Sequence, residues 1–252
     1  MGYAVGISDI RVTFADGSER DCLQKVYPIA RFIAAGFAGS VKIGFAMLGG
    51  LAFQLRDAPA DQAFLPQEVA NCFTPLAKDI FQSFPPDERD SHSHLMLLGA
   101  HPTEDFGIPG YARCSVHILR SPDFVPATAP VGEVVSIGSG SALPPYQEAL
   151  AGLSSNPMSL IQMETAGLGA SSLIVSMVVQ KTIERHPSPG ISPHAHICLV
   201  RRGCVGVSTN DEDRYPPSGE TIEIRMPRVA TNWKEFERMV TADCKSTQGA
   251  IC

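Results

Sequence analysis

The stretch RFIAAGFAGSVKIGF, from Arg31 to Phe45, decides the fold because its character changes halfway along. It begins as an apolar run typical of a strand, turns at Phe-Ala-Gly-Ser, and continues with small and apolar residues typical of a buried helix. A phosphate-binding P-loop requires the pattern GxxxxGK[ST], and Lys42 does not follow a second glycine here. The dinucleotide pattern GxGxxG is also absent. Two interpretations stay open: a strand-to-helix corner packed closely through glycine, and a turn whose N–H groups bind an oxyanion.

The composition is that of a folded, acidic chain. Its 252 residues are 44% hydrophobic and 18% charged, and the formal net charge is −6. This balance argues against a general nucleic-acid binder, which carries a basic surface. No segment reaches the ~18 uninterrupted apolar residues of a membrane span, and the first residues are too polar for a signal peptide. Seven cysteines without a CxxC pair favour reduced thiols, so we expect a cytoplasmic protein that binds neither nucleic acid nor membrane.

Hydrophobic periodicity predicts strands, two helices, strands, two helices and strands, in that order along the chain. This is not the strict alternation of a parallel doubly wound sheet, and it favours antiparallel sheets covered by helices, which is an α+β fold. Thr231 or Asn232 is expected to cap the final helix. The predicted strands are 3–14, 21–29, 31–35, 95–101, 112–119, 134–137, 196–200, 205–209 and 221–225, and the predicted helices are 39–55, 66–84, 144–153, 159–184 and 233–240.

Four short motifs follow one another along the chain: Asp9 in YAVGISDIR, Lys25 in LQKV, the glycine turn AAGFAGS, and VVSIGSGS. Together they resemble the proteasome β-subunit family, and most closely the bacterial heat-shock peptidase that partners an unfoldase ring. The resemblance is best over 3–55 and 131–153. It implies the four-layer αββα sandwich of the Ntn hydrolases, as a single domain over 1–252 with a strand–helix extension at about 219–252.

The resemblance also implies roles for individual residues. Asp9 matches the aspartate that pairs with a catalytic lysine, Arg11 an arginine common just after it, and Lys25 the lysine that lowers proton affinity near the nucleophile. Gly36 matches the glycine whose backbone N–H donates to the oxyanion, and Ser139 the serine near the nucleophile's amine. A fixed N–H stabilises developing negative charge, and a lysine beside a carboxylate stays charged. The alternative for Asp9 and Lys25 is an ordinary cross-strand ion pair.

The nucleophile is where this sequence departs from the family. Family members use a free N-terminal Thr, Ser or Cys on a strand before the aspartate, whereas residues 1–8 belong to the strand of Asp9. The family's later aspartate is missing too, although Ser188 or Ser192 stands near its serine. We therefore expect vestigial or supporting site residues in a catalytically inactive pseudoenzyme that acts as an assembly or scaffold protein. The alternative is a threonine-type peptidase whose first strand and nucleophile are missing from this chain.

Assembly is a separate expectation. Family members form rings, and the segment after Gly39 is apolar nearly all round, a surface that a monomer seldom exposes. We therefore expect a ring-like homo-oligomer, with an unfoldase as partner and a peptide or protein as substrate if the chain is active. No cofactor motif is present, so no cofactor is expected.

Two alternating histidine pairs, His92 with His94 and His194 with His196, offer a third interpretation. Each pair lies at a strand start and would face one side of a sheet, so together the pairs could bind the metal of a hydrolase. Neither pair is completed locally by a carboxylate or cysteine, and no metal site is therefore expected. Cys22 lies three residues before Lys25 on the opposite strand face, which favours a packing role.

Overall fold

The computed structural model describes most of the chain. Each pairing between its named strands is antiparallel. The described residues are 3–30, 32–56, 64–89, 92–105, 112–130, 133–155, 178–179, 181–201, 204–209 and 229–248.

The strands of the described residues form three sheets, of five, three and two strands. The order in the five-stranded sheet is β4 (Val26–Ala30), β5 (Ile33–Ala38), β6 (His94–Asp105), β7 (Ala112–Arg120) and β8 (Pro126–Thr128). The three-stranded sheet has the order β1 (Tyr3–Asp9), β9 (Ala195–Arg201) and β10 (Cys204–Thr209). The small sheet pairs β2 (Arg11–Thr13) with β3 (Glu19–Asp21).

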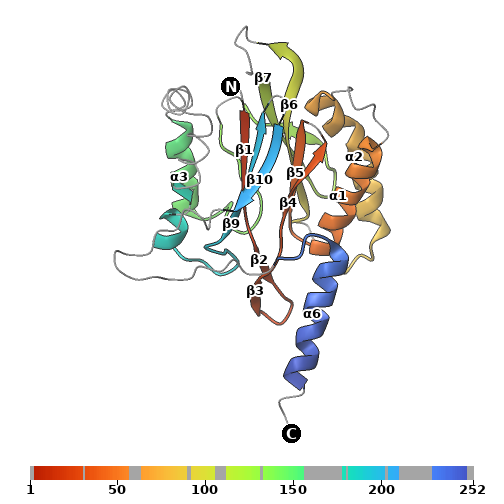
Figure 1. The fold of residues 1–252 in the computed structure, drawn as a ribbon, viewed down its shortest axis with the longest axis vertical. Coiled ribbons are helices and arrows are strands. Elements are labelled where there is room, and N and C mark those ends of the chain that lie inside the picture. The colour runs from red at the N-terminus through yellow and green to blue at the C-terminus, as the bar shows by residue number, and fades with distance from the viewer. Residues whose placement is uncertain are drawn as a thin grey trace.

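The two larger sheets pack face to face through small and apolar side chains (Figure 1). Ala4 of β1 and Val200 of β9 share one buried cluster with Ala34 of β5 and Leu98 of β6. Alternation along β5 places the neighbours of Ala34 on the other face, where helices cover them. The strand is therefore buried on both faces, which explains why its sequence is almost continuously apolar.

Helices α1 (Val41–Leu55) and α2 (Pro66–Ser83) cover the other face of the five-stranded sheet (Figure 1). Ile33 and Leu97 of the sheet share a core with Met47 of α1 and Phe73 of α2, and all four side chains are at most 1% exposed. Pro66 begins α2, where its missing N–H costs no helical hydrogen bond. Burying each of these large side chains contributes about 1.5–3 kcal/mol, so this layer contains much of the hydrophobic stabilisation.

The turn between β5 and α1 is packed through glycine. Gly39 has φ +93°, and a Cβ there would lie 2.5 Å from the carbonyl oxygen of His92. Ser40 caps α1 by accepting a hydrogen bond from the N–H of Ile43 at 3.4 Å. Gly44, one turn into the helix, leaves room for the ring of Phe37. The structure therefore supports the packing interpretation of this stretch.

Much of the apolar surface of α1 is buried within the chain itself. Buried residues of α1 lie in a core that also contains Ala70 and Phe73 of α2 and Phe236 of the last helix. Phe53 is the large apolar side chain of α1 that is strongly exposed, at 59%, and the guanidinium of Arg56 lies 3.7 Å from its ring centre. The exposed apolar surface of α1, through which assembly was expected, is therefore smaller than the sequence predicted.

Helix α3 (Pro144–Ser154) and the helical residues 181–185 lie on the side of the sheets away from α1 and α2 (Figure 1). The fold is thus a mixed α/β arrangement with helices on both sides of the sheets. The rest of the helix predicted at 159–184 falls outside the described residues, apart from 178–179, and so does the strand predicted at 221–225. No helix in the described part combines the length and apolar character needed to cross a bilayer.

The last helix, α6 (Trp233–Gln248), continues eight residues past the predicted end at Val240. The Asn232 side chain accepts from the N–H of Glu235 at 3.0 Å, which confirms the predicted cap. Phe236 stacks on Phe14 with ring centres 6.3 Å apart. Just before the helix, Ala230 forms a parallel bridge to Leu23.

Three strand predictions were wrong. The segment 3–14 is split between two sheets, because the Asp9 carboxylate accepts from the N–H of Arg11 at 2.8 Å and turns the chain. The segment 21–29 is likewise divided, since the N–H groups of Cys22 and Leu23 bond to the carbonyl of Ile10 and interrupt the strand. Residues 134–137 form no strand, whereas β8 was missed because it begins with proline, which is tolerated at a sheet edge.

Candidate functional site

Asp9 and Lys25 form the predicted ion pair. Lys25 Nζ lies 3.2 Å from both carboxylate oxygens of Asp9, and the two side chains are 16% and 25% exposed. Asp9 ends β1 in the three-stranded sheet, whereas Lys25 immediately precedes β4 in the five-stranded sheet. The pair therefore joins residues at two different sheets, and a functional role for Asp9 and Lys25 stays a prediction.

Gly36 lies beside Lys25, but on a strand and not on a tight turn. It pairs with Val26 of β4 on one side and Met96 of β6 on the other. A Cβ at Gly36 would lie 3.2 Å from the carbonyl oxygen of Lys25, which already accepts from the N–H of Phe37 at 3.1 Å. Successive residues of an antiparallel strand direct their N–H groups to opposite neighbours, so the Gly36 N–H points toward β6. The oxyanion role of Gly36 stays a prediction.

Ser139 lies in the loop before α3, close to the end of β5. The preceding Gly138 has φ +90°, and a Cβ there would lie 3.1 Å from the Cβ of Ala38. A Cβ at Gly190 would lie 3.5 Å from the Ser139 hydroxyl and 3.6 Å from that of Thr13. The fold thus brings Ser139 to the same end of β5 as Gly36. Ser139 is exposed.

A second network of charged side chains lies next to the Asp9 turn and is centred on Arg11, whose backbone N–H bonds to Asp9. The guanidinium of Arg11 donates to Asp21 at 2.8 and 3.3 Å and to Glu19 at 3.1 Å. The buried Ser192 hydroxyl donates to Asp21 at 2.7 Å and accepts from the N–H of His194 at 3.0 Å. Burial acts to raise the pKa of Asp21, but the bonds from Arg11 and Ser192 hold it below its usual range. Arg11 thus connects the Asp9 turn to the 190–194 loop.

Sequence reasoning marked Arg11 and Ser192 but missed Asp21. The carboxylate of Asp21 and the hydroxyl of Ser192 belong to residues 171 positions apart, so no local pattern reports their contact. The one available signal was the alternation of acidic and basic residues in Glu19-Arg20-Asp21, which places two carboxylates on the same face of a short strand.

Tyr146 was also missed, and it places α3 next to the site. Its hydroxyl donates to the carbonyl of His186 at 3.1 Å. Burial and the nearby charge of Asp9 raise the pKa of Tyr146 above its usual value. The phenol therefore lies within electrostatic reach of the ion pair, and it tethers α3 to the helical residues 181–185.

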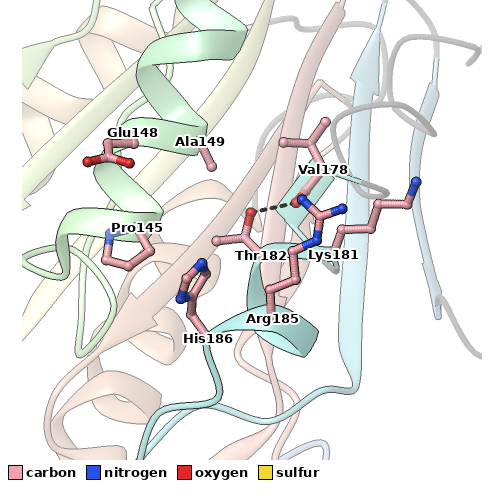
Figure 2. A pocket seen from close by; sticks show the side chains of 8 residues that line it. All are labelled: Pro145, Glu148, Ala149, Val178, Lys181, Thr182, Arg185 and His186. Carbon is pink, nitrogen blue, oxygen red and sulfur yellow. Dashed lines mark hydrogen bonds between the residues drawn. The ribbon is translucent and has the colours of Figure 1, made fainter.

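A pocket of about 290 Å³ opens between α3 and the helical segment that ends at His186. Figure 2 shows Lys181, Arg185 and His186 contributed by that segment, with Glu148 on the α3 side. The lining is therefore richer in basic than in acidic side chains, which is the reverse of the whole chain. Asp9 and Lys25 do not line this pocket, so it is a separate feature from the ion pair.

The histidine pairs do not assemble into a metal centre. His92 and His94 lie edge to face with ring centres 6.4 Å apart, and the N–H of His194 is held by Ser192. Within the described residues, no group of three or more His, Cys, Asp or Glu side chains could hold a metal ion. Cys22 is 1% exposed in the core between sheet and helices, as its predicted packing role requires.

Comparison with known proteins does not identify the chain: no family model matches it, and no curated protein is significantly similar.

Proposed function

We propose that this chain is a proteasome-like subunit with the Ntn-hydrolase fold, that it is catalytically inactive, and that it acts as an assembly or scaffold protein. The observation that carries the proposal is the Asp9–Lys25 pair, with both N···O distances 3.2 Å, formed between two facing sheets. Joining two sheets through a partly buried ion pair costs free energy, because the charged groups lose hydration that apolar side chains would not lose.

The arrangement of layers supports the fold assignment. The two larger antiparallel sheets share one apolar core, and α1 and α2 cover the outer face of the five-stranded sheet. The helices α3 and 181–185 lie on the far side (Figure 1). Helix, sheet, sheet and helix in that order are the layers of the proposed αββα sandwich.

The surroundings of Lys25 support the inactive assignment. Among the described residues, its ammonium group forms hydrogen bonds with the Asp9 carboxylate and with no Ser, Thr or Cys side chain. A lysine activates a nucleophile only when the two groups lie within hydrogen-bond reach of each other. Asp9, Lys25 and Ser139 would then be supporting residues of a site that lacks a nucleophilic atom.

The second candidate function is a threonine-type peptidase whose first strand lies outside this chain. The observation that favours it is the edge of β1: within the described part, β1 pairs with β9 alone. A further strand on that edge would run beside the strand that ends at Asp9.

The test combines a covalent inhibitor with intact-mass measurement of the native protein. An epoxyketone forms a morpholino adduct only with a free N-terminal nucleophile beside its amine, so we expect no mass increase. The Lys25→Ala variant and the surface control Lys42→Ala, whose lysine pairs with Glu88 at 2.7 Å, are treated in parallel. An adduct that forms in the wild type and in Lys42→Ala, but not in Lys25→Ala, would establish the peptidase instead.

Assembly is measured separately, by light scattering at micromolar concentration. A scaffold subunit of this family is expected to form a ring-like homo-oligomer, with an unfoldase as candidate partner. A stable monomer across that concentration range would contradict the scaffold function, whatever the inhibitor shows.

A further inference from the structure

A continuous chain of hydrogen bonds runs beneath the start of α2, across β6, β7 and β8. His101 Nε2 lies 3.2 Å from the Ser115 hydroxyl, which lies 2.8 Å from His117 Nε2. On the other side of the same ring, His117 Nδ1 lies 3.0 Å from the Thr128 hydroxyl. That hydroxyl donates to the side-chain oxygen of Gln67 at 2.7 Å. The chain thus links three strands to the first turn of α2.

The direction of each hydrogen bond follows from the last one. Thr128 has one hydroxyl proton and gives it to Gln67, so it must accept from His117 Nδ1–H. A neutral imidazole protonated at Nδ1 presents Nε2 as an acceptor, and the Ser115 hydroxyl is the donor within reach. Ser115 then accepts from His101 Nε2–H. Each of these four hydrogen bonds then has one donor and one acceptor, provided that the His117 ring stays neutral.

The described hydrogen-bond partners of the His117 ring, Ser115 and Thr128, carry no charge. Its side chain is 1% exposed, and β8 and α2 contribute the uncharged Thr128 and Gln67. The titratable group that acts on it is His101 of β6, which is itself 9% exposed. Burial, with the nearby His101, lowers the pKa of His117 to about 4. A second proton on this ring therefore has no carboxylate to offset it among the described residues that contact it.

We propose that this chain of hydrogen bonds is an acid-sensitive latch that holds β8 and the first turn of α2 to the sheet. Protonation would turn His117 Nε2 from an acceptor into a donor. Ser115 would then face two N–H donors, and its own hydroxyl proton would lose its acceptor. A buried charge and a broken series of hydrogen bonds both favour opening, and the opening is expected first at β8 and the first turn of α2, which Thr128 and Gln67 connect to His117. This latch is independent of the function proposed for the Asp9–Lys25 site.

The sign of the effect follows from linkage. Because the folded pKa lies below the ordinary value of 6.5, the closed latch is fully stable above that pH and is weakened as pH falls from 6.5 toward 4. With these two values, the opening equilibrium rises roughly a hundredfold between pH 7 and pH 4.

The experiment is hydrogen exchange on the full chain between pH 7 and pH 4, corrected for intrinsic rates, with circular dichroism to confirm that the global fold persists. The reporting amides are Ala129, which bonds to Val116 at 2.9 Å, and Val69, which bonds to Leu65 at 3.0 Å. We expect their opening to rise about a hundredfold in wild type and in the exposed-histidine control His186→Gln. In His117→Gln the rise should be absent.

Direct titration keeps the proposal falsifiable if His117→Gln does not fold. Nitrogen chemical shifts of the wild-type ring are expected to show the Nδ1–H form at neutral pH and no titration above about pH 5. Thr128→Val, which removes the acceptor for Nδ1–H, should increase opening at pH 7. A ring that titrates near 6.5, an Nε2–H form, or equal pH dependence in His117→Gln and wild type would overturn the latch.

Discussion

Gly44 and Gly49 lie on the same helix, and their replacement by alanine should change stability in opposite directions. Alanine is the better helix former by about 1 kcal/mol per residue, so propensity alone favours both substitutions. At Gly49 a Cβ would meet nothing within 4 Å. Gly49→Ala should therefore stabilise the protein by about 0.5–1 kcal/mol.

At Gly44 the new methyl group would overlap the ring of Phe37, with three ring atoms closer than 3.0 Å. That ring is 4% exposed and packs against Phe45 with centres 5.5 Å apart, so it cannot move without disturbing the core. Overpacking costs about 1–3 kcal/mol, and the extent of this overlap points to the upper half of that range. After the gain in helix propensity is subtracted, Gly44→Ala should destabilise by about 1–2 kcal/mol.

Urea denaturation measures both variants, with the midpoint as readout and an unchanged slope as evidence that the unfolding transition is the same. The two variants should differ by about 1.5–3 kcal/mol, or roughly 3–12 °C in melting temperature for a chain of this size. The cost of Gly44→Ala should shrink in a Phe37→Leu background, because the two sites are in contact. Equal stabilisation by both alanines would refute the assignment of Gly44 as a packing position.

Three further results are expected. Asn232→Ala should destabilise the protein by about 1 kcal/mol in urea, because the Glu235 N–H loses its cap; no change would mean that α6 contributes nothing to stability. The folded pKa of Asp21 is lowered, so its contribution is present above the unfolded value of about 3.9 and is lost as pH falls through the folded value. Asp21→Asn should therefore flatten the loss of stability below about pH 4, and an unchanged profile would contradict this. Peptide mapping after brief alkylation should show modification of the exposed Cys72 ahead of Cys114 and Cys198, whose pKa burial raises to about 12. Faster modification of Cys198 would contradict its burial.

Helices α1 and α2 were predictable because their signals are local. Pro66 at the start of α2 and the glycine corner before α1 act within one or two turns, and the observed bounds differ from the predicted ones by two residues or fewer. The two split strands were not predictable, because hydrophobic pattern continues through Ile10, which is fully buried where the chain changes sheets. The strand is divided there because the Asp9 carboxylate accepts a hydrogen bond from the backbone N–H of Arg11, a local interaction that a count of apolar residues does not detect.

The candidate site was predictable only where the resemblance supplied a partner. It paired Asp9 with Lys25, and the structure places them within 3.2 Å. Asp21 and Tyr146 had no such guide, because their roles depend on contacts with loop and helix residues far along the chain. The direction of the Gly36 N–H was likewise not predictable from the sequence, since it depends on which neighbouring strand accepts each N–H hydrogen bond.

The backbone bridge between Leu23 and Ala230 can form only after Ala230 has been synthesised. The N–H of Ala230 donates to Cys22 at 2.7 Å, and its carbonyl accepts from Gln24 at 3.1 Å, directly beside Lys25. About 200 residues separate the two ends of this bridge, so at 5–20 residues per second the ribosome needs roughly 10–40 s to supply the second end after the first. Lys25 therefore leaves the ribosome about 200 residues before Ala230, which provides the backbone bridge beside it. Until Ala230 has been synthesised, a growing chain holds the lysine without the bridge beside it.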